Sequence, residues 1–482
     1  MKQIITLLVA LLPFAFFGQD CGCEANYEWL KKTFEENDAG FDHALKQKGH
    51  QAYEDNNKRI SEKVKLAANL QDCGAILFEW LTFFRSEHIS LSIIEDTTEA
   101  ESKKNPIESF PDWEKYTIAT EDFKKYLDEK KAIDFEGIWE LGPYTIGVKQ
   151  EGAEHVGFII ESKAASWKKG QVKLKFTVEE NEAKSVFYLR DHSASESEQV
   201  NLIGNNLLQI GNSSLFRVYP AVADEPEYKN FYKFLKARSP YLERLNETTL
   251  YFRIPSFKHS QKKHIDSIIA SNRSLILKTE NLIIDIRNGT GGSDSSYEEI
   301  LPLIYTNPIR TLGVEYLSTE LNNKRMLDFI SKPEYGFDEA GKEWARTSFE
   351  KLESKRGEYV NLNLNDVETI RFDTIYSYPK NTGIIINDRN GSTDEQFLLA
   401  AKQSKKVKLF GTTTSGVLDI SNMYYVPSPC NQFELGYCLT RSLRIPGMEI
   451  DGKGLQPDFY IDSSILKHEW VGFVNEILDE QE

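Results

Sequence analysis

The chain has 482 residues, of which 40% are hydrophobic, so it can bury more than one core and two or three domains are expected. Its formal net charge is -16, and no long cluster of Lys and Arg stands out. This charge argues against a nucleic acid or an anionic membrane surface as the main partner.

The first 19 residues have the pattern of a secretory signal peptide. One Lys precedes the apolar run IITLLVALLPFAFF, which is shorter than the roughly 20 apolar residues that span a bilayer. An uncleaved membrane anchor is the alternative. No other stretch is apolar for long enough to span a membrane. The sequence therefore predicts an exported protein, secreted or periplasmic, with no transmembrane segment after signal removal.

Five cysteines follow this segment: Cys21, Cys23, Cys73, Cys430 and Cys438. Pairing is expected in an oxidising compartment, and the odd count leaves one cysteine over. Structural disulfides are favoured over a metal site, because no further Cys/His cluster accompanies the Cys-Gly-Cys spacing. Cys430 and Cys438 flank a segment with the pattern of a hairpin and are expected to pair with each other, and Cys73 with Cys21 or Cys23.

Residues 20–130 are predicted to form an N-terminal helical domain. Apolar residues recur at three- and four-residue spacing in residues 27–37 and 59–84, and glycines are sparse. The period then changes to two in residues 131–225, where short apolar runs are separated by turn residues. These runs predict an antiparallel β module, either a small barrel or a sandwich, with Trp139 and Trp167 in its core.

Residues 226–482 alternate between strand-like and helix-like segments, apart from a longer polar insertion at 307–375. This alternation predicts βαβ units and a parallel or mixed sheet. Ligand sites in such sheets lie outside the carboxyl ends of the strands. Two strand ends carry turn residues and polar side chains: IRNGTGG at residues 286–292 and NDRNGSTDE at residues 387–395.

The second of these turns is crowded with polar side chains and invites three interpretations. A calcium loop starting at Asp388 would need Gly at its sixth place and Glu at its twelfth, where the chain has Thr393 and Leu399. Ser392 or Asn390 can cap the helix that follows. A serine at a strand–turn–helix junction also exposes its hydroxyl beside helix N–H groups that can bind an oxyanion. The cap and the nucleophile are compatible, and the calcium loop is excluded.

Four segments, in this order, resemble the tail-specific, or C-terminal-processing, serine peptidases, in the branch of the tricorn core and the retinoid-binding-protein-like members. They are DIRNGTGG (285–292), NGSTDE (390–395), GTTTSGVLDISN (411–422) and DGKGLQPDFYID (451–462). The segment FRSEHISLSI (84–93) extends the resemblance to the helical domain. The resemblance implies a multidomain α+β chain whose C-terminal α/β domain is ClpP/crotonase-like with a mixed sheet. Because this family commonly carries a PDZ domain, it also makes a degenerate PDZ domain an alternative for residues 131–225.

The resemblance also implies residue roles. Ser392 is the implied nucleophile of an acyl-enzyme mechanism. The lysine of the Ser–Lys branch is replaced here by Val417, so His88 is the implied general base. Asp451, where relatives often carry Glu, is the implied orienting carboxylate, with Glu449 as a rival.

Backbone N–H groups of Thr393 and Gly291 are the implied oxyanion donors, and Glu87 is a possible supporting residue for the base. The expected activity is that of a serine endopeptidase that acts on protein or peptide substrates without a metal or an organic cofactor. Two rivals stay open. One is a catalytically inactive peptide- or ligand-binding protein on the same scaffold, and the other is an esterase for a small ester. Oligomeric state and specificity are not assigned.

Overall fold

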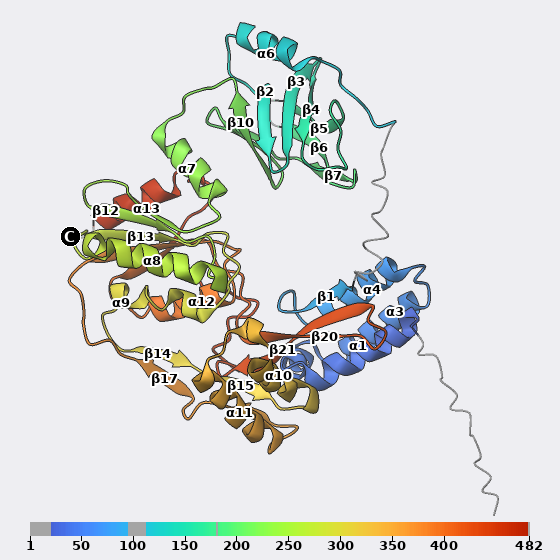
Figure 1. Ribbon diagram of the computed structural model, residues 1–482, viewed down its shortest axis with the longest axis vertical. Coiled ribbons are helices and arrows are strands. Elements are labelled where there is room, and N and C mark those ends of the chain that lie inside the picture. Colours follow the sequence, from blue (N-terminus) through green and yellow to red (C-terminus); the bar gives the residue numbers. More distant parts are fainter. Residues whose placement is uncertain (1–20, 95–111, 180–181, 481–482) are drawn as a thin grey trace, which may run out of the picture. The chain divides into compact units, whose positions relative to one another are not determined.

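The protein is described from a computed structural model that covers residues 21–94, 112–179 and 182–480 (Figure 1). The signal peptide predicted for residues 1–19 lies outside these ranges. The chain divides into two compact units: Met1–Glu95 with Leu242–Tyr460, and Asp96–Tyr241 with Ile461–Glu482. Within the described ranges, no helix combines the length and the apolar character that a membrane crossing would need.

The first unit begins with four helices, α1 (Cys23–Asn37), α2 (Phe41–Lys48), α3 (His50–Val64) and α4 (Leu70–Thr82). The Asn69 side chain accepts the Asp72 N–H at 2.8 Å and so caps the start of α4. Their apolar faces share a core that includes Phe34 and Trp80. The expected helical N-terminus is confirmed, but β1 (Ser90–Ile93) follows α4 as a strand.

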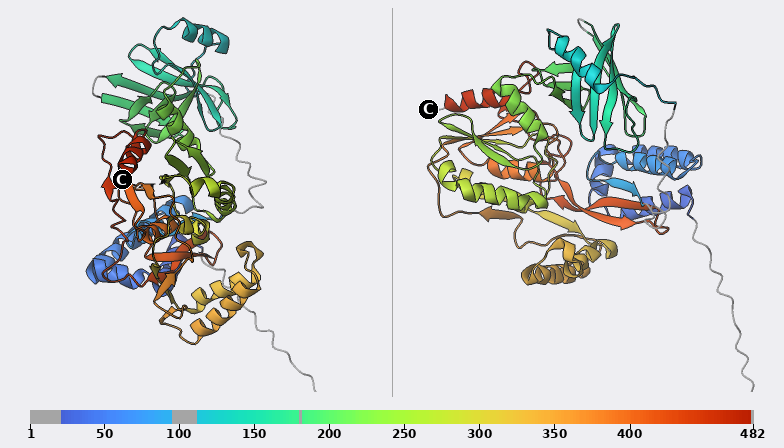
Figure 2. Two further views of the ribbon diagram at one scale, coloured as in Figure 1. Left: turned by 90° about the vertical axis from the view of Figure 1, so that its left-hand side faces the viewer. Right: turned by 45° about the horizontal axis from the view of Figure 1, so that its top comes forward.

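That strand joins a five-stranded sheet with β15 (Val314–Leu317), β16 (Tyr359–Asn361), β20 (Ile420–Pro427) and β21 (Phe433–Ser442). β21 pairs with β1 and β15 along one edge and with β20 along the other, because its residues 434–436 pair with β1 and β20 at once. β20 therefore lies at the edge of this sheet. Figures 1 and 2 both show the β20–β21 hairpin beside the N-terminal helices.

The six-stranded sheet of the first unit has the order β11 (Tyr241–Arg244), β12 (Thr249–Arg253), β13 (Asn281–Asp285), β18 (Asn381–Ile386), β19 (Val407–Gly411), β22 (Phe459–Tyr460). All pairings from β12 to β22 are parallel. The strands are apolar almost without interruption because they are covered on both faces, and α8 (His259–Ile276), α9 (Leu301–Ile304) and α12 (Thr393–Ala401) contribute to the same core. The predicted α/β architecture with its sheet of parallel strands is confirmed.

The segment expected to be a polar insertion has regular structure. It contains β14 (Ile309–Leu312), β15, α10 (Glu320–Ser331), the short 3-10 helix η2 (Pro333–Tyr335), α11 (Glu339–Glu353), β16 and β17 (Val367–Ile370). Another 3-10 helix, η1 (Asp294–Tyr297), follows the turn after β13. The insertion has a small core of its own around Met326, Leu352 and Val360. Its strands are short and its helices polar, which is why the sequence pattern was weak.

The second unit is built on a nine-stranded sheet whose described pairings are all antiparallel. Its strands are β2 (Gly137–Leu141), β3 (Tyr144–Glu151), β4 (Glu154–Ser162), β5 (Val172–Glu179), β6 (Glu182–Tyr188), β7 (Ala194–Ser197), β8 (Val200–Ile203), β9 (Leu207–Ile210) and β10 (Ser213–Tyr219). Helices α6 (Thr120–Glu129), α7 (Pro226–Lys236) and α13 (Trp470–Asp479) belong to the same unit. The predicted β module is confirmed, and Trp139 and Trp167 are buried in its core.

The disulfides correct one expectation. Cys21 pairs with Cys430 and Cys23 with Cys73, while Cys438 is free and buried. The predicted Cys430–Cys438 pair is wrong, because Cys430 lies in the turn before β21 and Cys438 lies five residues into that strand. Five residues of strand span roughly 17 Å, far beyond the Cα separation of about 7 Å that a disulfide can bridge.

Candidate active site

Ser392 lies at the junction between β18 and α12 in a strained backbone conformation. Its φ is 58° and its ψ is -120°, although a side chain disfavours positive φ. The turn follows the carboxyl end of a parallel strand and opens directly into the first turn of a helix. A strained strand-to-helix turn of this kind holds a serine hydroxyl clear of the sheet, where a substrate carbonyl can reach it.

The glycine turn after β13 meets Ser392 from the neighbouring strand. β13 and β18 are paired in parallel, so their carboxyl ends lie together. A methyl group built at Gly291 would lie 2.8 Å from Ser392 Cβ and 3.1 Å from the Thr393 nitrogen, and Gly291 has φ +80°. Only glycine fits such an approach. The structure therefore brings Ser392, Thr393 and Gly291 together.

Glu395 ties this turn to the segment that follows β19. Its Oε2 accepts the N–H groups of Ser392 at 3.3 Å and Val417 at 2.9 Å. Its Oε1 accepts the Thr414 hydroxyl at 2.6 Å and the Gly416 N–H at 2.7 Å. These four bonds connect the first turn of α12 to residues 414–417. The main contribution of Glu395 is to hold residues 414–417 against the serine turn.

His88 lies between α4 and β1, and its imidazole is fixed by a backbone carbonyl. Nδ1 donates to the Ile420 oxygen at 2.6 Å, so the proton sits on Nδ1 and Nε2 keeps its lone pair. Burial is the main cause that lowers the pKa of His88, and the nearby Arg85 acts in the same direction. The ring is thus neutral at neutral pH, as a general base must be.

Three groups hold the backbone at His88. The Arg85 guanidinium donates to the His88 carbonyl at 2.9 Å and pairs with the buried Asp38 carboxylate at 2.7 and 2.5 Å. The Cys438 thiol donates to the same carbonyl at 3.3 Å, and the Cys438 N–H donates to Asp38 at 3.0 Å.

Asp451 lies next to this arrangement but does not bind the imidazole. Its carboxylate accepts the N–H groups of Leu418 at 2.6 Å, Asp419 at 2.6 Å and Ile420 at 3.1 Å. The acceptor on His88 is therefore the Ile420 carbonyl, and Asp451 fixes the short stretch that presents it. Burial is the main cause that raises the pKa of Asp451.

The other two carboxylates that the sequence proposed lie apart from the imidazole. Glu449 accepts the Gly447 N–H and pairs with Lys453 at 3.3 Å, and the Gly447 bond is the main cause that lowers the pKa of Glu449 to about 2. Glu87 is exposed and acts on His88 only through its charge, which raises the pKa of the imidazole.

Asp394 is a buried carboxyl whose environment the sequence did not reveal. Its Oδ2 accepts the Asn390 amide at 2.8 Å, and its Oδ1 has no hydrogen-bond partner. Asn390 in turn donates to the Ile286 carbonyl at 2.7 Å, which links it to the glycine turn. Burial raises the pKa of Asp394 to about 7. A charge pattern at a helix start gives no signal of such burial.

The site thus consists of two groups of residues joined by residues 414–420, which we call the linking segment. Glu395 binds its first part and Asp451 its last part, and Ile420 at its end holds His88. The imidazole and the Ser392 hydroxyl are not hydrogen-bonded to each other. The arrangement offers a strained serine, backbone donors and a neutral imidazole, which are the components of acyl transfer.

Solved structures of known proteins share this fold. Mature CPAF complexed with lactacystin is 12% identical, with 95% of this chain and 98% of that chain covered and a TM-score of 0.51. Mature CPAF alone is 11% identical over 95% and 96% of the two chains, also with a TM-score of 0.51. At these identities the likeness concerns the fold alone.

The photosystem II D1 C-terminal processing protease is 10% identical over 96% of this chain and 98% of that chain, with a TM-score of 0.39. No curated protein matches the sequence. Residues 248–461 match the sequence model described as Peptidase family S41. That range spans the glycine turn, the serine turn, the linking segment and Asp451, so this part of the chain is similar to peptidase family S41.

Proposed function

We propose that the protein is an exported serine peptidase that cleaves protein or peptide substrates through an acyl-enzyme on Ser392. The observation that carries this proposal is the strained backbone of Ser392, with the Gly291 backbone in contact with it and the Thr393 nitrogen beside it. A positive φ at a non-glycine residue is costly and persists where the surrounding structure requires it, as at a nucleophile. The match of residues 248–461 to a peptidase family supports the same assignment.

In the proposed mechanism, His88 Nε2 takes the hydroxyl proton as Ser392 Oγ attacks the substrate carbonyl carbon. The N–H groups of Thr393 and Gly291 would stabilise the oxyanion. The imidazolium then gives its proton to the leaving amine, and the C–N bond breaks. A water molecule, deprotonated by His88, hydrolyses the acyl-enzyme and restores the serine. The Ile420 carbonyl holds the Nδ1–H throughout and keeps the tautomer that this cycle needs.

Proton transfer requires His88 Nε2 to come within hydrogen-bonding distance of Ser392 Oγ, and catalytic hydrogen bonds are often long before substrate binds. The linking segment is the element that touches both groups, since Glu395 and Asp451 bind its two parts. We propose that substrate binding closes the remaining separation by drawing this segment toward the serine turn.

Export is proposed from the cysteines. The disulfides Cys21–Cys430 and Cys23–Cys73 fit an oxidising compartment, where such bonds persist. The predicted signal sequence precedes them in the chain.

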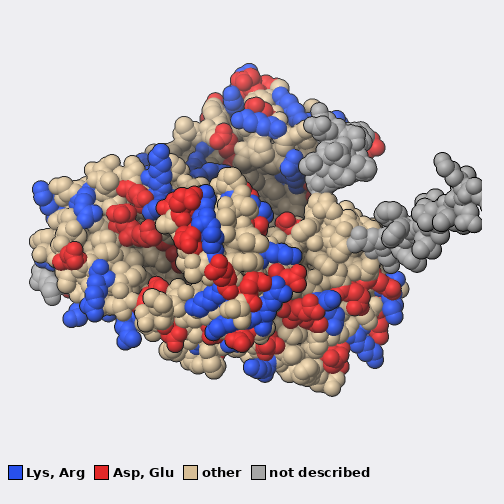
Figure 3. Space-filling model, turned by 60° about the horizontal axis from the view of Figure 1, so that its bottom comes forward, with Lys and Arg blue, Asp and Glu red and all other residues tan. Residues whose placement is uncertain are grey.

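On the face drawn in Figure 3, acidic and basic side chains are interspersed, which suits a protein substrate better than a nucleic acid.

A fluorophosphonate probe tests the proposal directly. The wild-type protein should become labelled, and Ser392→Ala should abolish the labelling, while Ser421→Ala on β20 serves as a matched control and should be labelled like the wild type. A wild type that is neither labelled nor active on peptides would favour the inactive binding protein. A peptide library set against a panel of nitrophenyl esters separates a peptidase from an esterase.

A further inference from the structure

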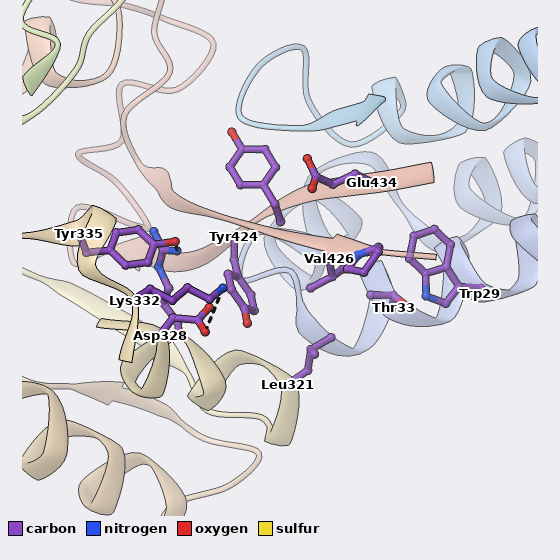
Figure 4. Close-up of a pocket in the computed structure, with 12 residues that line it drawn as sticks. Trp29, Thr33, Leu321, Asp328, Lys332, Tyr335, Tyr424, Val426 and Glu434 are labelled. Carbon is purple, nitrogen blue, oxygen red and sulfur yellow. Dashed lines mark hydrogen bonds and ion pairs between the residues drawn. The ribbon is translucent and has the colours of Figure 1, made fainter. Parts of the chain in front are cut away.

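A groove in the first unit lies outside the residues assigned to catalysis. It has a cavity volume of about 510 Å³ and is bordered by α1, by α10 with η2, and by β20 (Figure 4). Figure 4 shows Trp29 of α1 on one side and Asp328 and Tyr335 on the other. Four aromatic side chains line it: Trp29, Tyr335, Tyr424 and Tyr425.

The groove runs along the free edge of β20. Successive side chains of a strand point to opposite faces, yet residues 424–427 all line the groove, so it must follow the edge of the strand. Among the strands that the structure describes, β20 pairs only with β21. Its outer edge therefore presents backbone N–H and C=O groups to the groove, and such groups are a template for another extended chain.

The same strand leads to the proposed catalytic site. β20 begins at Ile420, whose carbonyl binds His88. At the rise of a β-strand, Tyr424 lies about 13 Å and Pro427 roughly 23 Å along the strand from Ile420. A single extended chain could therefore follow β20 from the groove to the neighbourhood of His88.

The charges that line the groove compensate one another. Lys332 pairs with Asp328 at 3.2 Å. Arg325 donates to the Tyr335 hydroxyl, and its guanidinium lies 4.5 Å from the centre of the Tyr335 ring. Glu434 adds a second acidic group, so two cations face two anions. This balance is complementary to an uncharged segment with bulky apolar side chains and does not suit a polyanion.

We propose that this groove binds an extended segment of the peptide substrate, which adds as a strand to the free edge of β20. A bulky apolar or aromatic side chain of the substrate, about four to seven residues from the scissile bond, lies among the aromatic rings of the groove. This inference rests on the proposed function, because only a peptidase would have the bound peptide as its substrate. The binding of the peptide in the groove is a separate claim.

Binding is tested on the Ser392→Ala chain, which holds a peptide without cleaving it. The probes are fluorescein-labelled 12-residue peptides with a single Phe moved along an otherwise uncharged sequence. Tyr425→Ala and Tyr335→Ala should each weaken the tightest peptide by about tenfold, because an aromatic contact in a binding groove is lost. Tyr460→Ala, at a tyrosine 67% exposed compared with 50% at Tyr425, is the matched control and should leave the affinity unchanged.

Strand addition has its own test, because only alternate residues of an added strand hydrogen-bond to its neighbour. Two versions of the tightest peptide are N-methylated, one at odd and one at even positions. One version should lose about tenfold or more in affinity and the other little, since only one set of N–H groups faces β20. Equal losses in both versions would overturn the assignment to the strand edge.

Measurements of hydrolysis distinguish a failure of the groove proposal from a failure of the proposed function. In the otherwise wild-type chain, Tyr425→Ala should raise KM for the 12-residue peptide and leave a short nitrophenyl ester unaffected. If Tyr425→Ala is active and its KM for the 12-residue peptide is unchanged, the groove does not bind substrate, but the proposal of a peptidase is unaffected. If only one of the two N-methylated peptides loses affinity and the wild-type chain hydrolyses no peptide, the groove is a peptide-binding site and the proposal of a peptidase is wrong. A dimer that Tyr425→Ala dissociates would instead assign the groove to a second copy of the chain.

Discussion

The serine turn and the surroundings of His88 are held in place in different ways. Ser392 is fixed mainly by backbone geometry: a positive φ, a glycine turn on the adjacent parallel strand and the start of α12. His88 is fixed by hydrogen bonds between residues far apart in sequence, 332 residues for Ile420 and 350 for Cys438. The proposed nucleophile is thus part of the folded sheet, whereas the proposed base depends on the contact between the N-terminal helices and the β20–β21 hairpin.

This difference predicts where the site is most easily damaged. A change at the serine turn disturbs a backbone conformation inside the core of the α/β domain and should cost stability together with activity. A change around His88 should lower turnover while the six-stranded sheet stays folded. The following variants test this division, in order of decreasing effect.

His88→Gln should lower kcat by about 10³-fold or more, since loss of a general base commonly costs 10² to 10⁴ and Gln cannot accept the serine proton. Steady-state kinetics on a peptide substrate measure the effect. His264→Gln, at an exposed histidine of α8, is the control and should retain full activity. A loss in His88→Gln of less than tenfold would remove His88 from the mechanism.

Glu395→Gln should lower the free energy of unfolding by about 3 kcal/mol, because its carboxylate accepts four donors and an amide would turn its own N–H₂ group toward some of them. Urea unfolding of both proteins measures the difference. Glu298→Gln, at an exposed residue of the same unit, should change stability little. Equal stability in Glu395→Gln and wild type would show that the serine turn does not need the hydrogen bonds that the Glu395 carboxylate accepts.

Asp451→Asn should lower kcat about 10- to 100-fold, because a single amide oxygen cannot satisfy the three N–H groups of residues 418–420 that present the acceptor for His88. Burial keeps the pKa of His88 below its usual 6.5, and the Asp451 charge raises it. Activity requires neutral His88, so it falls as the pH drops through this pKa.

Removing the Asp451 charge should lower the His88 pKa further and move the acid limb of the kcat/KM profile to lower pH. Asp451→Glu keeps the charge and should leave the position of that limb nearly unchanged, even if kcat falls. A purely structural role would lower kcat in both variants without moving the limb of Asp451→Asn.

Asp394→Asn should have the smallest effect, and it should appear in stability. The pKa of Asp394 is raised from 3.8 to about 7 by burial, so the folded state holds this proton more tightly than the unfolded state. Its contribution to stability is fully present below pH 3.8 and is lost as the pH rises through 7. Between pH 5 and pH 8 the variant should gain about 2–3 kcal/mol relative to wild type, measured by thermal melts. If the stability of both proteins changed with pH in the same way, the pKa of Asp394 would not be raised in the folded state.

The serine half of the site was accessible to sequence reasoning because its signals are local. The apolar runs before residues 286 and 387 predicted the strands, and the glycines and the serine after them marked the turns. The structure brings Ser392, Thr393 and Gly291 together where those patterns implied. Their catalytic roles stay predictions.

The part of the site around His88 was harder to predict from the sequence. Ile420 binds the imidazole through a main-chain carbonyl, which every residue possesses, so no residue type could mark it. Arg85, Asp38 and Cys438 meet only after the helices pack against the hairpin. The failed Cys430–Cys438 pair has the same origin, since sequence proximity does not reveal that one cysteine lies in a turn and the other deep in a strand.

The disulfide between Cys21 and Cys430 has a consequence for proteolytic nicking. It joins the beginning of α1 to the turn of the β20–β21 hairpin, across a sequence separation of 409 residues. A single cut in the backbone between His88 and Ser392 would yield two fragments, one with each of these residues. The disulfide would still join them covalently, so the two-chain protein would keep both groups in one molecule until it met a reductant.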